Sequence, residues 1–146
     1  MPICLDTSVA VKLLTREPDS ALATALAGRV VAANDHFIAP SLFRYEVANS
    51  VWQKVRRGTI DAATGRTVLR DLDRVQIRYL EASSLATVAW SIAAQLAIPS
   101  MYDAHYLAAS QLTGAPLWTA DRRLANAAAN WSGELRLLGR DAPDHV

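Results

Sequence analysis

The sequence repeatedly places a short apolar run directly before a helical stretch. The runs 3–5, 37–39 and 117–119 are too short for helices, and each stops at a polar or turn-forming residue, as buried strands do. The alternating run 75–80 and the run 135–137 are further strand candidates. Strands that alternate with helices indicate a parallel sheet whose two faces are covered. We therefore expect an α/β fold with a central parallel sheet covered by helices on both faces.

The segments between these runs carry the signals of helices. Their expected spans are 9–14, 21–27, 40–57, 61–74, 85–98, 101–112 and 122–129. Gly28 and Gly58 are expected to end the second and third helices, because glycine readily adopts the left-handed conformation found after helix C-termini. Asp61 is expected to cap the fourth helix, and Ser83 or Ser84 the fifth.

Composition narrows the class of protein. With 146 residues, of which 51% are hydrophobic and 20% charged, the chain has the size and core of one domain, which we expect to span residues 1–146. The single cysteine, Cys4, cannot form an internal disulfide, which favours a reducing cytoplasm. The longest apolar stretch, 85–98, is too short for a membrane span, so we expect no membrane association.

The net charge does not decide whether the protein binds nucleic acid. A formal charge of +1 provides no strong field for nucleic acid. Every basic residue except Lys12 and Lys54 is arginine, whose guanidinium suits bidentate contacts with phosphate. A compositional bias of the genome would give the same arginine excess.

Four acidic residues stand where an apolar segment meets polar residues. Asp6 directly follows the predicted strand 3–5, and Asp121 lies two residues beyond the predicted strand 117–119. Glu46 lies in the second turn of one predicted helix, and Asp103 lies in the first turn of another. The carboxyl ends of parallel strands meet at one edge of a sheet, so all four side chains can point into one crevice. Acids that converge without matching bases are most often compensated by a hard divalent cation.

Each acid also has a purely structural explanation. Asp6 and Asp121 could be helix N-caps, and Asp103 could complete a capping box with Ser100. Glu46 could lie on a solvated helix face. Asp103 fits this explanation least well, because its helix is apolar almost all round and a buried acid needs a partner.

Four motifs occur in order along the chain: Asp6-Thr-Ser8 after the first strand, the helical Glu46, Tyr102-Asp-Ala-His-Tyr106-Leu-Ala108, and Thr119-Ala-Asp121 followed by Arg-Arg-Leu124. Together they resemble the PIN-domain nucleases, and more narrowly the VapC toxins of bacterial toxin–antitoxin pairs. The resemblance covers essentially the whole chain, although the stretch 58–75 matches only in being helical. It implies a PIN-like fold.

The resemblance also implies an activity and partners. The expected protein is an endoribonuclease that depends on Mg²⁺ or Mn²⁺, acts on RNA, forms a homodimer and is held inactive by a cognate antitoxin. The C-terminal segment of the antitoxin would lie over the active site, whose groove is lined by the early helices; these helices here hold Leu13, Leu14, Tyr45 and Trp52. The acids carried over as catalytic residues and metal ligands are Asp6, Glu46, Asp103 and Asp121, with Ser8 and Thr119 as polar support.

The chemistry of phosphodiester hydrolysis agrees with this set of residues. Oxygen ligands select Mg²⁺ or Mn²⁺ over softer metals, and such ions acidify bound water and neutralise a departing oxyanion. We expect Asp6 as the central ligand and Asp103 as its co-ligand, with the other two acids binding directly or through water. The arginines that flank these segments are candidates for RNA contact or for solvated surface positions: Arg44, Arg122 and Arg123.

Two other functions remain open at this point. A haloacid-dehalogenase-like phosphatase would use Asp6 as a nucleophile within D-x-D-x-T, but Ser8 stands where the second Asp is required. A catalytically silent PIN-like binding module is the second alternative, although such modules usually lack one or more of the acids. A trapped phospho-aspartate would indicate the phosphatase, and an absence of Mn²⁺ binding would indicate the silent module.

Overall fold

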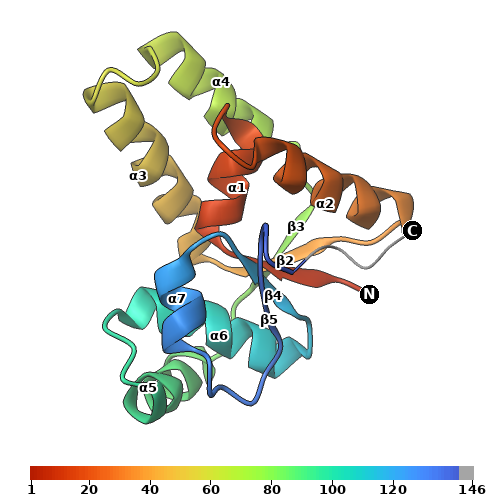
Figure 1. Cartoon of the computed structure of the whole chain (residues 1–146), viewed down its shortest axis with the longest axis vertical. Coiled ribbons are helices and arrows are strands. Elements are labelled where there is room, and N and C mark those ends of the chain that lie inside the picture. The colour runs from red at the N-terminus through yellow and green to blue at the C-terminus, as the bar shows by residue number, and fades with distance from the viewer. Residues whose placement is uncertain (142–146) are drawn as a thin grey trace.

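The protein folds around one parallel sheet, which the computed structural model describes together with the rest of residues 1–141. Its strands lie in the order β3-β2-β1-β4-β5 (Figure 1). They are β1 (Ile3–Leu5), β2 (Phe37–Pro40), β3 (Ile77–Leu80), β4 (Leu117–Thr119) and β5 (Leu135–Leu137). All neighbouring strands run parallel, which confirms the predicted sheet. The third strand begins at Ile77, later than expected, because Val75 closes a turn onto the carbonyl of Leu72.

Seven helices in the described residues surround this sheet. They are α1 (Thr7–Leu14), α2 (Ser20–Ala32), α3 (Leu42–Arg56), α4 (Ala62–Leu72), α5 (Leu85–Leu96), α6 (Met101–Thr113) and α7 (Arg122–Ala127). Figure 1 shows α1 and α2 on one side of the strands and α5, α6 and α7 on the other, with the α3–α4 pair extending beyond the sheet. The expected covering of both faces is thus confirmed.

The predicted end of α2 at Gly28 is wrong. The helix continues through this glycine to Ala32, because Val30 extends the buried stripe formed by Ala23 and Leu26. Burial of that stripe outweighs the modest cost of a glycine inside a helix. Gly58 does end α3, with φ of 74°, and Asp61 caps α4 by accepting a hydrogen bond from the Thr64 amide at 2.7 Å.

Helix α6 is the most deeply embedded helix of the core. Its segment 106–110 is buried throughout, and it packs against β1, β2 and β4. The first strand beneath it is buried as well, and burial raises the pKa of Cys4 to about 12, so this thiol stays protonated. Among the described residues no single helix could span a membrane; α5 and α6 pass that test only as a pair bent by 111°.

The order of the strands creates a crevice. From β1 the chain proceeds outward to β2 and β3 on one side, and it then returns to place β4 and β5 on the other side. In open α/β sheets, ligands bind outside the carboxyl ends of the strands at such a switch point. Asp6 directly follows β1, and Asp121 lies two residues beyond β4. The fold therefore places two of the predicted acids at the same crevice.

Candidate active site

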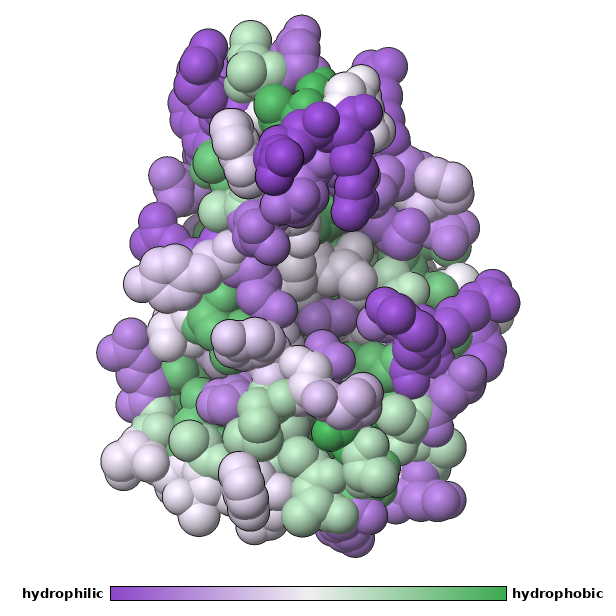
Figure 2. Space-filling model, turned by 90° about the vertical axis from the view of Figure 1, so that its left-hand side faces the viewer, coloured by the Kyte–Doolittle hydropathy of each residue, from purple (hydrophilic) through white to green (hydrophobic). Residues whose placement is uncertain are grey.

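All four predicted acids line one cleft. This cleft has a volume of about 550 Å³ and lies between α1, α3, α6 and the segment before α7. Figure 2 looks onto this side of the molecule: hydrophilic residues cover the upper part, hydrophobic residues gather in the lower part, and the hollow between them has a hydrophilic floor. The acids that line the cleft are Asp6, Glu46, Asp103 and Asp121.

Asp6 is the most buried of the four, with a residual exposure of 5%. It occupies the N-cap position of α1 but makes no side-chain capping hydrogen bond, so capping does not explain its presence. Its Oδ2 instead accepts hydrogen bonds from the hydroxyls of Ser8 at 2.6 Å and Thr119 at 2.7 Å. Burial raises the pKa of Asp6, and these two hydroxyl donors oppose the rise.

The same two hydroxyls join the ends of β1 and β4. The Thr119 Oγ1 also accepts a hydrogen bond from the Asp121 amide at 3.0 Å. The Ser8 Oγ accepts one from the Ala120 amide at 2.8 Å. Each hydroxyl thus accepts from the backbone and donates to Asp6. This network fixes the orientation of the carboxylate before any ligand arrives. A supporting role of Ser8 and Thr119 in catalysis stays a prediction.

Glu46 is held by α6 and α1. Its Oε1 accepts a hydrogen bond from the Tyr106 hydroxyl at 2.6 Å and lies 3.5 Å from the Thr7 hydroxyl. Burial raises the pKa of Glu46, the bond from Tyr106 lowers it, and the charge of Asp6 raises it. The helix face that Glu46 shares with Asn49, Ser50 and Gln53 lines the cleft, and Glu46 itself is half-buried there.

Asp103 does not complete a capping box. Ser100 caps α6 by accepting from the Tyr102 amide at 3.2 Å, and within residues 1–141 no hydrogen bond reaches the Asp103 side chain. Burial raises the pKa of Asp103 to about 6, with further increases from Asp6, Asp121 and Glu46 and an opposing effect of Arg123. The side chain therefore faces other acids across the cleft.

Asp121 has two roles. Its Oδ1 accepts a hydrogen bond from the Arg123 amide at 2.8 Å and so caps α7, as the structural explanation requires. The same residue lines the cleft, and its charge raises the pKa of both Asp6 and Asp103. Capping and participation in the acidic cleft are compatible here, because the N-terminus of α7 opens onto the cleft.

The three predicted RNA contacts occupy different surroundings. Arg123 lines the cleft, whereas Arg122 is exposed beside it. Arg44 points elsewhere: it pairs with Asp73 at 3.2 Å and lies over the Tyr79 ring at 5.9 Å. These contacts hold the guanidinium of Arg44 away from the four acids of the cleft.

Several cleft residues escaped the sequence reasoning. Tyr106, whose buried hydroxyl binds the cleft residue Glu46, belongs to one of the recognised motifs but had no predicted role, although its spacing of three from Asp103 places both on one helix face. The basic residues Lys12, Lys54 and Arg57 also line the cleft. Lys54 forms an ion pair with Glu17 at 2.5 Å, and Arg57 is exposed at the rim. No local motif marks these residues, because they reach the cleft only through the packing of α1 against α3.

The donor atoms that the cleft offers are of the chemical type that a hard cation prefers. The four acids supply only oxygen, and within residues 1–141 no Lys or Arg side chain forms a salt bridge with Asp6, Glu46 or Asp103. No group of three His, Cys, Asp or Glu side chains in this part of the chain is close enough to hold one ion jointly. Carboxylates that face one another repel, so a cation would draw them together. Ligation by these four acids stays a prediction.

Comparison with known proteins identifies the family. Residues 3–130 match the PIN domain. The chain belongs to the PIN-domain family. A curated relative of this PIN-domain protein, Ribonuclease VapC3 of Pyrobaculum aerophilum, is 30% identical over 128 residues, which are 86% of this chain and 93% of the relative. The predicted resemblance is confirmed, and the phosphatase alternative is set aside.

Solved structures show the same fold. The structure of VapBC2 from Rickettsia felis, bound to a DNA fragment from their promoter, superposes with a TM-score of 0.70 at 15% identity and covers 94% of this chain and 98% of that chain. PAE2754 from Pyrobaculum aerophilum superposes with a TM-score of 0.68 at 22% identity and covers 92% of this chain and 83% of that chain. These likenesses confirm that the PIN-like arrangement extends over nearly the whole chain.

Proposed function

We propose that this PIN-domain protein is a metal-dependent endoribonuclease that hydrolyses RNA phosphodiester bonds and acts as the toxin of a toxin–antitoxin pair. The observation that carries the proposal is the convergence of four carboxylates on one cleft at the switch point of the sheet. The alignment with the relative named Ribonuclease VapC3 spans 86% of this chain, which supports RNA hydrolysis as the reaction. We further propose that residues 1–146 form a single nuclease domain in the cytoplasm.

We propose that Asp6 and Asp103 hold Mg²⁺ or Mn²⁺, with Glu46 and Asp121 binding directly or through water. When bound, such an ion acidifies water and offsets the negative charge that develops on the phosphate and the leaving oxygen. The oxygen-only donor set favours these cations over zinc or copper. Burial and, after it, repulsion by Asp6, Asp121 and Glu46 raise the pKa of Asp103 to about 6, and the repulsion supports this role because a cation relieves it.

The side chains around the acids would orient them for this task. Ser8 and Thr119 both bind Oδ2 of Asp6 and so fix the plane of its carboxylate. Tyr106 fixes Glu46 through Oε1. The exposed Arg57 and Arg123 on the rim are placed to contact phosphates of a bound strand, which would offset the acidity of the cleft for a polyanion.

The decisive experiment compares two acid-to-amide variants. Cleavage of a fluorogenic RNA should disappear in EDTA and return with Mg²⁺ or Mn²⁺. Asp6→Asn should reduce the rate at least about a hundredfold, because it removes one charge from the centre of the cleft. Asp19→Asn is the matched control: it makes the same chemical change at an exposed residue whose left-handed φ of 69° suits asparagine.

Four outcomes would contradict the proposal. Full cleavage by metal-free protein would exclude the metal-dependent reaction, and equal loss of activity in both variants would exclude a specific role for Asp6. If neither RNA cleavage nor heat of Mn²⁺ binding can be measured, the protein is a silent binding module. A phosphoenzyme trapped on Asp6 would instead indicate a haloacid-dehalogenase-like phosphatase.

We also propose a cognate antitoxin and a homodimer as partners. A groove of about 590 Å³ includes Leu13 and Leu14 of α1 and residues of α2 and α4, and Tyr45 and Trp52 are exposed on α3. Trp90 on α5 is 69% exposed, which supports a contact between two copies. Light scattering should give twice the mass of the chain, and Trp90→Ser should reduce that mass to one chain if α5 forms the contact.

A further inference from the structure

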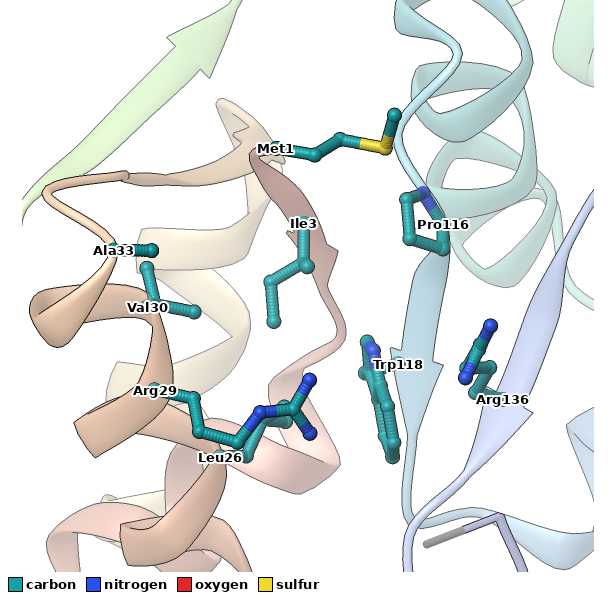
Figure 3. A pocket seen from close by; sticks show the side chains of 9 residues that line it. All are labelled: Met1, Ile3, Leu26, Arg29, Val30, Ala33, Pro116, Trp118 and Arg136. Carbon is teal, nitrogen blue, oxygen red and sulfur yellow. The ribbon is translucent and has the colours of Figure 1, made fainter. Parts of the chain in front are cut away.

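A second cavity lies on the side of the sheet covered by α2. It has a volume of about 370 Å³ and is bounded by the start of β1, the start of β4 and the last turns of α2 (Figure 3). Ile3 and Pro116 line it, whereas Asp6 and Asp121 follow the opposite ends of these two strands. Among the described residues, none lines both this cavity and the acidic cleft. It is therefore a separate feature of the fold.

The lining of this cavity is apolar and positively charged. Leu26, Val30, Ile3, Pro116 and Trp118 provide apolar walls. Among the described residues that line it, the charged side chains are two arginines, Arg29 and Arg136, and no acid lines it. An apolar pocket with a few convergent polar groups is the usual form of a small-molecule site, and this volume falls within the usual size range.

The two arginines differ in their pairing. Arg136 is ion-paired with Glu134 at 2.6 Å and lies over the Trp118 ring at 5.9 Å, so it belongs to the wall. Arg29 extends from α2 towards Trp118 (Figure 3). Its Nη1 is buried and has no hydrogen-bond partner within residues 1–141. A buried guanidinium nitrogen without a partner is costly, and an anion in the cavity would satisfy it.

We propose that this cavity binds a small organic anion, with a phosphate or carboxylate on Arg29 and an apolar or aromatic portion against Leu26, Val30 and Pro116. A guanidinium recognises both anions through two parallel hydrogen bonds. The position of Arg29 in the last turn of α2 explains a positive charge there by itself. It does not explain why Nη1 of this half-buried side chain is buried without a hydrogen-bond partner in residues 1–141.

Calorimetric titration in EDTA tests the proposal, because without metal the acidic cleft repels anions. The probes are adenosine 5′-monophosphate and benzoate, with adenosine as the uncharged counterpart of the first. The monophosphate, benzoate or both should bind at least about tenfold more tightly than adenosine. The stronger of the two identifies phosphate or carboxylate as the preferred anion.

Variants then assign the binding to Arg29. Arg29→Gln should weaken binding at least about tenfold, whereas Arg29→Lys should retain part of it and Arg66→Gln, at an exposed arginine of α4, should retain all of it. Asp6→Asn should also leave binding unchanged, which separates this site from the nuclease reaction. Binding of neither anion, equal binding of adenosine and its monophosphate, or full binding by Arg29→Gln would each overturn the proposal.

Discussion

Tyr106 donates a hydrogen bond from its phenol to Oε1 of Glu46 at 2.6 Å, and this bond connects the most buried helix of the core to an acid of the cleft. The same phenol oxygen lies 2.7 Å from the Thr7 hydroxyl. Burial and the charge of Glu46 raise the pKa of Tyr106, so it remains a protonated donor. The orientation of Glu46 therefore depends on the position of a core side chain.

Tyr106→Phe should separate this bond from core packing. The ring still fills its place, but Glu46 loses its shortest hydrogen bond, so we expect RNA cleavage to fall about tenfold. Stability should fall by about 1–2 kcal/mol, because Thr7 and Glu46 keep a partly buried polar atom without that partner. Single-turnover kinetics and urea unfolding measure the two effects. Tyr102→Phe, on the exposed side of α6, is the control, and an equal loss of cleavage there would contradict the interpretation.

Thr119→Val should move the acid limb of the pH–rate profile. The Thr119 hydroxyl lowers the pKa of Asp6, so its removal should raise that pKa and require a higher pH to form the carboxylate. We expect the limb to shift upward by about half a pH unit or more, consistent with loss of one hydrogen bond to a charged group. Thr67→Val, at an exposed site on α4, should leave the limb in place. A limb that does not move in Thr119→Val would count against Asp6 as the ionised group.

Without metal, stability should fall as pH rises through the mildly acidic range. The pKa of Asp103 is raised from its ordinary 3.8 to about 6, so the folded protein binds more protons than the unfolded chain between these values. The stabilising contribution is complete below the unfolded value and is lost as pH rises through the folded one. Urea unfolding in EDTA from pH 3.5 to 7 measures it, and Asp103→Asn should flatten this part of the curve. An identical slope in both proteins would contradict the raised pKa.

Metal should stabilise the wild type more than Asp103→Asn. A cation that binds only the folded state raises the melting temperature by mass action, and loss of one ligand weakens that effect. In EDTA the variant should melt at the same or a higher temperature than the wild type, because one repelling charge is absent. Melting curves in EDTA and in excess Mn²⁺ provide the comparison. Equal shifts by Mn²⁺ in both proteins would remove Asp103 from the metal site.

Two helical glycines should respond oppositely to alanine. Apart from its chain neighbours and the backbone of its own helix, no atom of residues 1–141 lies within 4 Å of a Cβ built on Gly28, so Gly28→Ala should stabilise the protein by about 0.5–1 kcal/mol. At Gly65 the Cβ would meet Val55 Cγ2 at 2.9 Å, because α4 packs closely on α3 there. Gly65→Ala should therefore be at least about 1 kcal/mol less stable than Gly28→Ala. If both variants were stabilised equally in urea unfolding, α3 and α4 would separate easily enough to make room for the added methyl group.

Most of the fold could be predicted because its signals are local. Short apolar runs mark the strands, and Gly58 and Asp61 mark helix boundaries through their own backbone conformation and side chain. Gly28 misled the prediction because its local preference was outweighed by burial of Val30, which depends on the sheet beneath α2. Local propensity is weak where tertiary packing supplies a larger energy.

The sequence by itself determined the class of fold and the identity of the four acids, because strand and helix periodicity and short motifs depend on neighbouring residues. Only the tertiary structure decided which groups hold those acids. Thr119 and Asp6 are 113 residues apart, and Tyr106 and Glu46 are 60 apart, yet each pair shares a hydrogen bond below 3 Å. Such pairings depend on the order of the strands and the packing of helices across them, which no local pattern of residues encodes.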